Sequence, residues 1–217
     1  MAPDIAFFRR VMGQFATGIT IVTTRSQEGI AGLTVNSFTS VSLNPLLVLV
    51  CIDSRSKALP FLRAGGVFAI NILAQEQEEL SNCFASSSNE RYAYFCHAQH
   101  HVAATGAPIL ADTLGFIDAR VTTEYPGGDH VIFLGKVEAM GYEGQTFFMP
   151  GIESAQNTLL APVSTTDPVS SNGHNEPAST PASPLLYYRG QYYHLSNRYH
   201  HQHPELAPTA AQQHDKR

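Results

Sequence analysis

The stretch "GLTVNSFTSVSLNP", from Gly32 to Pro45, begins like a β-strand and then places polar side chains on both faces. Val, Thr and Phe favour the pleated, half-buried surface of a strand. Here, however, small hydrogen-bonding side chains are interleaved with the apolar ones: Thr34, Asn36, Ser37, Thr39, Ser40, Ser42 and Asn44. The pattern indicates either a Thr- and Ser-rich surface strand or a cradle for a polar ligand.

The segments around this stretch are rich in strand-forming residues and are joined by short links. "ITIVTT", from Ile19, is followed by the polar turn "RSQEG", which is typical of a hairpin. "LLVLVCI", Leu46–Ile52, is apolar on both faces and predicts a central strand buried on each side. "GFIDARVTTEY" and "HVIFLGKVEAM" flank the tight turn "PGGD". The fold class that this favours is mainly β: an antiparallel barrel with flanking helices.

Helices are expected at three places. Asp4 can cap a helix that should pack on a sheet through its apolar residues Phe8, Val11, Met12 and Phe15. Ser56 is placed to cap "KALPFLRA", and "QEQEELSNCFA" carries Glu in its first turn. The following "SSSNERYAYF" is expected to be a polar loop, and "LLYYRGQYYHL" a late strand that completes the sheet.

Composition excludes several classes of protein. The 217 residues include 18 acidic and 13 basic side chains, with a formal net charge of -5 and no block of Lys or Arg that would suit nucleic acid. No apolar run is long enough for a membrane span, and no signal peptide is recognised, so a cytoplasmic protein is expected. Cys51, Cys83 and Cys96 show no C-x-x-C spacing, which favours buried free thiols.

The chain is expected to form one domain with an interruption. Residues 161–184 are dominated by Pro, Ser and Thr and predict a disordered insertion. The domain therefore comprises residues 1–160 plus 185–197, and residues 198–217 form a polar tail.

The polar strand would suit a flat heteroaromatic ligand such as isoalloxazine. Side chains from Thr34, Asn36, Ser37, Ser40 and Ser42 could meet the edge of the ring, while Val35 and Val41 line its face.

A second candidate site lies where the buried strand ends. In "CIDSRSK", Cys51–Lys57, the residues Asp53, Ser54 and Ser56 precede a helix whose first amides could hold a phosphate. Arg55, Lys57, Arg63 and Arg91 could add positive charge. The alternative is an ordinary Ser N-cap with solvated bases.

A third candidate is "GGDH", Gly127–His130, at a hairpin mouth. The glycines permit close approach of a ligand, and Asp129 could orient His130. A plain turn with a chance His is the alternative. The clusters "HAQHH" at His97 and "HHQH" at His200 have no matching carboxylate or Cys ligands, so no metal is expected.

Taken together, seven segments resemble the short-chain flavin reductase components of two-component flavin-dependent monooxygenases, from about Phe7 to Tyr193. They are "FATGITIVTT", "GLTVNSFTSVSLNP", "CIDSRSKALPFL", "FAINIL", "LSNCFA", "YPGGDHVIFLGKV" and "PLLYYRGQYY". The resemblance implies a homodimeric FMN-binding split barrel with Greek-key antiparallel topology. In such a protein, NADH or NADPH delivers hydride to FMN or FAD, and reduced flavin serves a separate oxygenase.

By the same resemblance, the polar stretch Thr34–Ser42 holds the isoalloxazine and ribityl chain, and Ser54, Ser56 and Lys57 approach the flavin phosphate. Ala85 and Arg91 lie near the ribityl or adenylate end, and His130 contacts the nicotinamide nucleotide. This chain has Leu46 after Pro45, where the family commonly has two prolines, and its insertion before "PLLYYRG" is longer.

The hydride chemistry would belong to the two cofactors, so the protein need only position them, and His130 is expected to be a positioning residue. Two alternatives stay open: a module that binds or stores flavin without turnover, and an electron-transfer protein that reduces ferric complexes.

Overall fold

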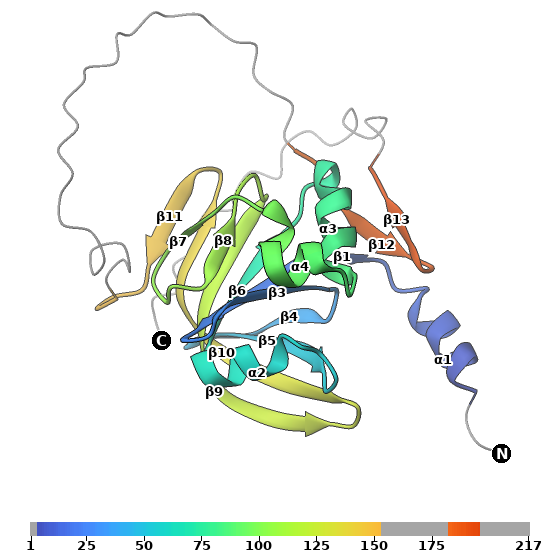
Figure 1. The fold of residues 1–217 in the computed structure, drawn as a ribbon, viewed down its shortest axis with the longest axis horizontal. Coiled ribbons are helices and arrows are strands. Elements are labelled where there is room, and N and C mark those ends of the chain that lie inside the picture. The colour runs from blue at the N-terminus through green and yellow to red at the C-terminus, as the bar shows by residue number, and fades with distance from the viewer. Residues whose placement is uncertain (1–3, 153–181, 196–217) are drawn as a thin grey trace, which may run out of the picture.

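A computed structural model describes residues 4–152 and 182–195 of the chain. Sheets make up most of this part, and every strand pair in it is antiparallel (Figure 1). The strands are β1 (Thr17–Gly18), β2 (Thr20–Ser26), β3 (Gly29–Val35), β4 (Phe38–Leu43), β5 (Leu46–Asp53), β6 (Val67–Ile72), β7 (His100–Val102), β8 (Pro108–Leu110), β9 (Gly115–Gly127), β10 (His130–Tyr142), β11 (Gln145–Phe148), β12 (Leu186–Tyr188) and β13 (Gln191–Tyr193). The helices are α1 (Ile5–Met12), α2 (Leu59–Gly65), α3 (Glu78–Ala85) and α4 (Asn89–Tyr94), with 3-10 turns at Gln75–Gln77 and Phe95–His97.

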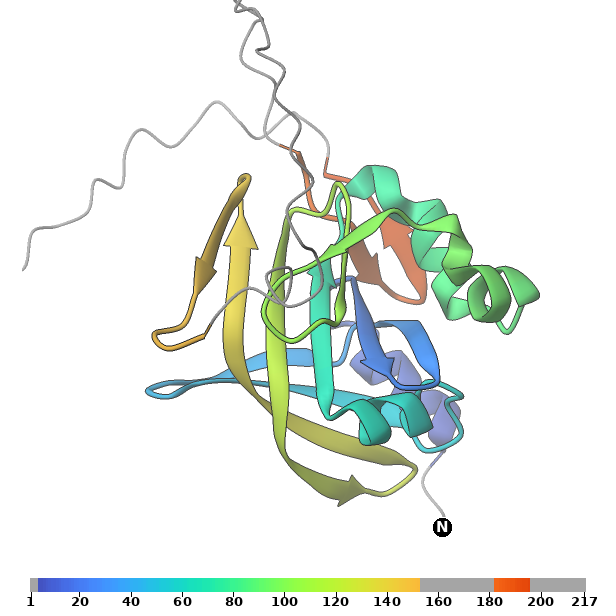
Figure 2. The same cartoon turned by 60° about the vertical axis from the view of Figure 1, so that its left-hand side comes forward.

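The main sheet has the order β3-β2-β6-β9-β10-β5-β4, and β11 adds to β10. The predicted hairpins β2–β3 and β9–β10 both form, so these local patterns were interpreted correctly. β9 and β10 are long strands that bend at two register shifts, and Figure 2 shows them sweeping beneath α2. The fold is therefore mainly β and antiparallel, as predicted.

The stretch that opened the sequence analysis is two strands and not one. β3 ends at Val35, β4 begins at Phe38, and only Asn36 and Ser37 join them. β3 and β4 nevertheless stand at opposite ends of the sheet order. Since three Cα–Cα steps lead from Val35 to Phe38 and reach at most about 11 Å, the sheet must curve until its two edge strands approach each other at this point.

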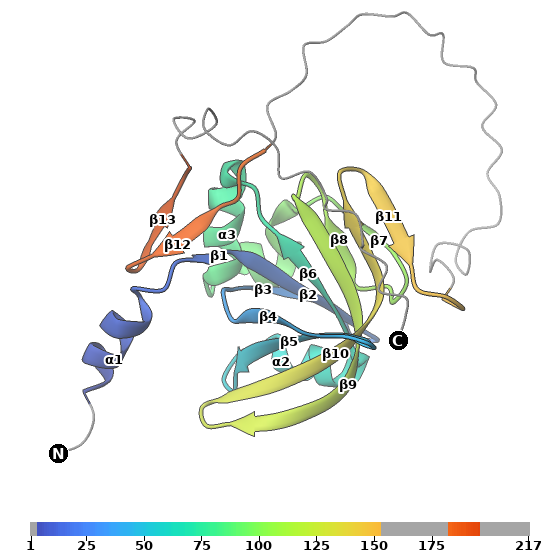
Figure 3. The ribbon, with the colours of Figure 1, turned by 180° about the vertical axis from the view of Figure 1, so that it is seen from behind.

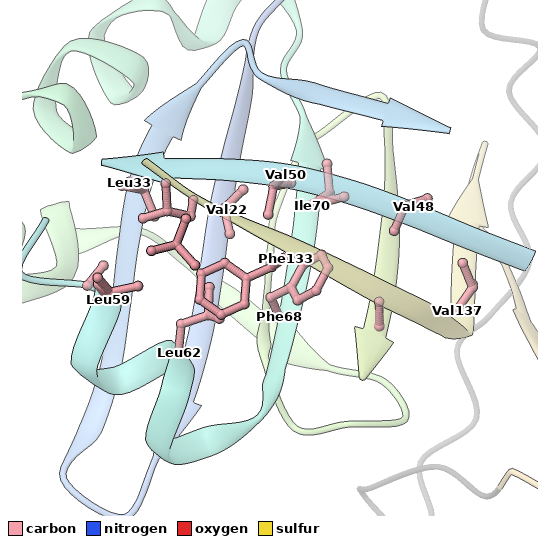
Figure 4. Packing of buried hydrophobic residues seen from close by; sticks show 14 residues of the cluster. Val22, Leu33, Val48, Val50, Leu59, Leu62, Phe68, Ile70, Phe133 and Val137 are labelled. Carbon is pink, nitrogen blue, oxygen red and sulfur yellow. The ribbon is translucent and has the colours of Figure 1, made fainter. Parts of the chain in front are cut away.

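The core lies on the concave side of this curved sheet. Figure 4 shows Val22, Val50, Phe68 and Phe133 from four strands packed against Leu62 of α2. On β5 the inward residues Val48, Val50 and Ile52 are buried, whereas Leu47, Leu49 and Cys51 on the other face are only half-buried. Within the described residues, the prediction that β5 is buried on both faces was therefore wrong, because no described element covers the outer face completely.

The N-terminal helix begins as predicted, with the Asp4 carboxylate accepting a hydrogen bond from Ala6 N at 2.9 Å. It does not pack on the main sheet, however, and none of its residues is buried. Figures 1 and 3 show α1 projecting from the body beside the β12–β13 hairpin. That hairpin pairs with β1 in a separate three-stranded sheet. The prediction that it completes the main sheet was therefore wrong.

Three further expectations need correction. Ser56 is not the N-cap of α2, because the helix begins at Leu59 after Ala58. The expected loop "SSSNERYAYF" contains α4, where Glu90 lies in the first turn and Arg91 in the last, as suits a helix dipole. Cys83 and Cys96 form a disulfide, because the turn after α4 returns to α3, and only Cys51 is a free thiol.

The predicted insertion and tail lie mostly outside the described residues, as do residues 153–160. Residues 182–184 are described and contact the folded body, where Gln75 N donates to the Ser183 carbonyl at 2.9 Å. No helix in the described ranges is long and apolar enough to cross a membrane.

Candidate functional site

The end of β5 brings residues of the three predicted sites together. On one side of the strand, Asp53 is paired with His130 of β10, and Ser54 N donates to the Asp129 carbonyl at 2.9 Å. On the other side, the Ser37 hydroxyl donates to the Cys51 carbonyl at 2.8 Å. With strands about 4.8 Å apart, Ser37 and His130 lie about 10–12 Å from each other across β5.

His130 is oriented by its neighbour in the hairpin. Its Nδ1 lies 2.7 Å from Asp129 Oδ1, and this hydrogen bond lowers the pKa of the Asp129 carboxyl. With Nδ1 engaged by a carboxylate, Nε2 is the ring nitrogen left for a ligand. The His130 side chain is 42% exposed, so a ligand can reach it. Asp129 thus acts on His130 as the sequence suggested.

The positive charges around the "CIDSRSK" segment divide into two groups. Arg55 binds Asp53 through both side-chain and backbone N–H groups, which holds the pKa of Asp53 well below its usual range. Arg63 forms an ion pair with Glu124 at 3.0 Å. Both guanidinium charges are therefore compensated, in contrast to the free bases expected from the sequence.

Lys57 and Arg91 meet over one aromatic ring. Lys57 Nζ lies 4.5 Å and the Arg91 guanidinium carbon 4.9 Å from the centre of the Tyr92 ring. Arg91 is buried and donates from Nε to the Gly32 carbonyl at 2.9 Å and from Nη1 to the Ser86 carbonyl at 2.8 Å. Burial lowers the pKa of Arg91, and within the described residues neither cation has a carboxylate partner. An anionic group would stabilise both charges.

The polar stretch is distributed over several places. Thr34 faces α3, where its hydroxyl donates to the Ser81 carbonyl at 2.6 Å, and Ala85 lies at the end of that helix. Val35 packs against the core, because strand alternation turns it to the concave face, so it does not line the candidate site. Ser40, Val41 and Ser42 lie along β4 about 10–16 Å beyond Ser37, at a β-bulge. Only Asn36 and Ser37 remain at the strand break.

The strand break opens onto two adjoining cavities. A cavity of about 560 Å³ lies between α1, β12 and the residues Asn36 and Ser37. A second, of about 400 Å³, lies against β1 and Phe38, and the two share Phe15, Thr17 and Asn36. The Thr17 hydroxyl is buried and has no hydrogen-bond partner in the described structure. Because buried polar atoms are normally satisfied, this atom points to a ligand that fills the cavities.

These cavities contain residues that the sequence analysis did not assign to the site. Thr17, Phe15 and Arg189 belong to segments quoted for the resemblance, "FATG" and "YYRG", but no role was carried over to them. The break in the apolar alternation at Asn36 is a local signal of the site that the sequence does contain. The approach of α1 to β12, by contrast, depends on segments far apart in the chain, and neither segment alone indicates it.

The residues present fit a flavin. The cavities combine aromatic walls with the Thr17 hydroxyl and the Asn36 amide, as a ring with several polar edge atoms requires. Lys57 and Arg91 supply uncompensated charge for a phosphate. Among residues 4–152 and 182–195, no group of three metal-ligating side chains gathers, and His200 lies outside these ranges.

Two curated proteins similar to this chain are named as reductases. Over 145 residues the chain is 40% identical to an NADH-dependent FMN reductase of Streptomyces nodosus subsp. asukaensis, which covers 64% of this chain and 75% of that protein. It is 35% identical over 137 residues to the reductase subunit of a flavin-dependent monooxygenase of Mycobacterium tuberculosis, covering 63% and 72%.

A solved structure agrees with these relatives. The NADH:FAD oxidoreductase of Streptomyces globisporus, in complex with NAD and FAD fragments, superimposes with a TM-score of 0.64 at 28% identity, covering 90% of this chain and 95% of that one. The family described as "Flavin reductase like domain" matches residues 12–196. The chain therefore belongs to the flavin reductase-like family.

Proposed function

We propose that this protein is an NAD(P)H:flavin oxidoreductase. It reduces FMN or FAD with NADH or NADPH and supplies the reduced flavin to a separate monooxygenase. The observation that carries this proposal is the meeting of three segments around β5: Ser37 on one side, His130 on the other, and Ser54–Lys57 at the end of the strand. Family membership and the activities named for the relatives support it.

In this proposal the chain binds and orients its ligands and performs no covalent chemistry. Flavin and nicotinamide, when bound, supply the acceptor and the donor of hydride. Asn36 and Thr17 hold polar ring edges, Lys57 and Arg91 hold a phosphate, and Asp129 fixes the His130 ring so that Nε2 faces the nicotinamide side. Burial raises the pKa of the Cys51 thiol, and the proposal gives this residue no part in the reaction.

The activity is tested by a steady-state assay of the full chain. Purified protein should oxidise NADH or NADPH only when FMN, FAD or riboflavin is added, since orientation of two bound cofactors lowers the barrier. Consumption of neither donor with any of the three flavins would leave the flavin-storage alternative, and reduction of ferric complexes without free flavin would favour the electron-transfer alternative.

Replacing His130 with alanine should raise the Michaelis constant for NADH or lower the hydride-transfer rate. The expected loss is about five- to tenfold in kcat/KM, the value of one hydrogen bond. Flavin affinity should be unchanged, because His130 is assigned to the nicotinamide. Stopped-flow bleaching of flavin measures the rate, and His101→Ala, an exposed histidine on β7, is the control. Normal hydride-transfer kinetics in His130→Ala would show that "GGDH" is only a turn and that His130 does not contact the nicotinamide nucleotide.

The proposal extends to the closure of the sheet and to the assembly. A split barrel is supported by the two-residue link between the edge strands β3 and β4. A homodimer is supported by two exposed apolar surfaces: the half-buried outer face of β5, and the side of α1 that carries Phe7 and Val11, which are 59% and 52% exposed. We also place the enzyme in the cytoplasm and keep residues 161–184 as an insertion outside the catalytic domain.

A further inference from the structure

The cavity beside Asn36 continues into a groove that ends at arginine side chains. A third cavity, of about 460 Å³, is lined by Arg9, Arg10 and Arg189 and shares Arg9, Gly13, Arg189 and Gly190 with the 560 Å³ cavity. The two cavities adjoin at these shared residues, and their linings together reach from the strand break, past Phe15 and Thr17, to the cluster of Arg9, Arg10 and Arg189. In a chain with a net charge of -5, this cluster is a local concentration of positive charge.

A clip of hydrogen bonds joins the segment after α1 to the β12–β13 hairpin. Arg189 N donates to the Gly13 carbonyl at 2.9 Å, and Arg189 Nη2 and Nε donate to Gln14 Oε1 at 2.8 and 3.1 Å. A β-carbon added to Gly13 would lie 3.5 Å from the Arg189 α-carbon, so the two backbones are in close contact. The clip therefore ties the two walls of the groove to each other.

The positive charges of these arginines are mostly not compensated by carboxylates in the described residues. Within residues 4–152 and 182–195, Arg9 and Arg189 form no ion pair, and Arg10 meets only the exposed Asp4 at 3.6 Å. Gln14 is neutral, so it orients the Arg189 guanidinium without cancelling its charge. Guanidinium groups bind phosphate oxygens through paired hydrogen bonds, and such charge-assisted bonds are stronger than neutral ones.

We propose that this groove between α1 and the β12–β13 hairpin binds the pyrophosphate of the nicotinamide dinucleotide, with Arg9 and Arg189 as its ligands. The inference rests on the proposed function. The arginine end of the groove suits the phosphates of the donor, and the end at Thr17 and Asn36 is the place proposed above for the flavin ring, against which the nicotinamide lies for hydride transfer. A flavin pyrophosphate has the same chemistry, but Lys57 and Arg91 already provide a separate cationic place for the flavin phosphate.

The test compares two hydride donors. Arg9→Gln should raise the KM for NADH about tenfold, the equivalent of one charge-assisted hydrogen bond. With 1-benzyl-1,4-dihydronicotinamide, which has no phosphate, the KM should change less than about twofold, since the lost contact does not exist there. Arg9→Gln is the preferred variant, because the Arg9 side chain takes no part in the clip and its loss should not disturb the groove. At Arg189, the pair Arg189→Lys, which keeps the charge, and Arg189→Gln, which removes it, separates the effect of charge from that of the clip. Arg25→Gln, an exposed arginine on β2, is the matched control.

A binding measurement keeps the two proposals distinguishable. Calorimetric titration with ADP-ribose, which carries the pyrophosphate without nicotinamide, should show binding that Arg9→Gln weakens about tenfold. If the wild type oxidised neither donor with any flavin, the proposed function would fail, while the titration would still decide the groove. Unchanged NADH and ADP-ribose binding in Arg9→Gln would overturn the groove assignment. An equal rise in the KM of both donors would also overturn it, as would a variant that loses affinity for FAD and not for NADH.

Discussion

Replacing Cys83 and Cys96 together with serine should lower the free energy of unfolding by about 3 kcal/mol, the chain-entropy value for a loop of about 15 residues. The two cysteines are 13 positions apart and tie α3 to the turn after α4. Without the bridge, the unfolded chain regains freedom that the disulfide removes. Urea denaturation measures the change, with the slope of the transition as a check on two-state behaviour.

The same experiment in dithiothreitol provides the control. A dithiol reduces the disulfide to two thiols and is itself oxidised, so the wild type should fall to the stability of the double variant, which should not respond. The bridged segment carries Ser86 and Arg91, so reduction should also weaken FMN binding. A wild type that is indifferent to dithiothreitol would show that the two cysteines are free thiols, as the sequence alone suggested.

Changing Ser56 and Lys57 together to alanine should weaken FMN binding by about 1–3 kcal/mol, or about 5- to 150-fold, because charge-assisted hydrogen bonds to the phosphate are lost. Riboflavin has no phosphate and should bind the variant as it binds the wild type. Fluorescence titration with both flavins measures the difference.

Lys136→Ala is the matched control for this double change. Lys136 lies exposed on β10 and forms no ion pair in the described residues, so its removal alters net charge without touching the Lys57–Tyr92–Arg91 cluster. Equal losses of FMN and riboflavin in Ser56→Ala/Lys57→Ala would remove the phosphate assignment. A similar loss of FMN affinity in Lys136→Ala would show that the effect comes from the change in net charge and not from a local phosphate site.

Patterns within one segment were interpreted correctly where local physics decides the structure. The Asp4 cap, the β2–β3 hairpin and the long β9–β10 hairpin depend on residues a few positions apart, and all three form. α4 was not predicted although its charges follow the helix dipole, because the run of serines before it is typical of a loop.

The sequence patterns did not predict which distant segments pair with each other. Nothing in "LLYYRGQYY" shows that it pairs with β1 and not with the main sheet, because edge strands select partners through the surrounding fold. Cys83 and Cys96 gave no sign of a bridge, since their distance depends on how α4 turns back to α3.

By itself, the sequence determined that this chain is a mainly β protein of the flavin reductase-like family, with Ser37, Lys57 and His130 as candidate site residues. Hydrophobic alternation, turn chemistry and ordered motifs carry that information locally. Only the tertiary structure decided that Arg91 joins Lys57 over Tyr92, that Val35 turns inward, and that Arg9 and Arg189 meet across a groove. These contacts join residues far apart in the chain, and their geometry is set by the curvature of the sheet and by the packing of helices on it.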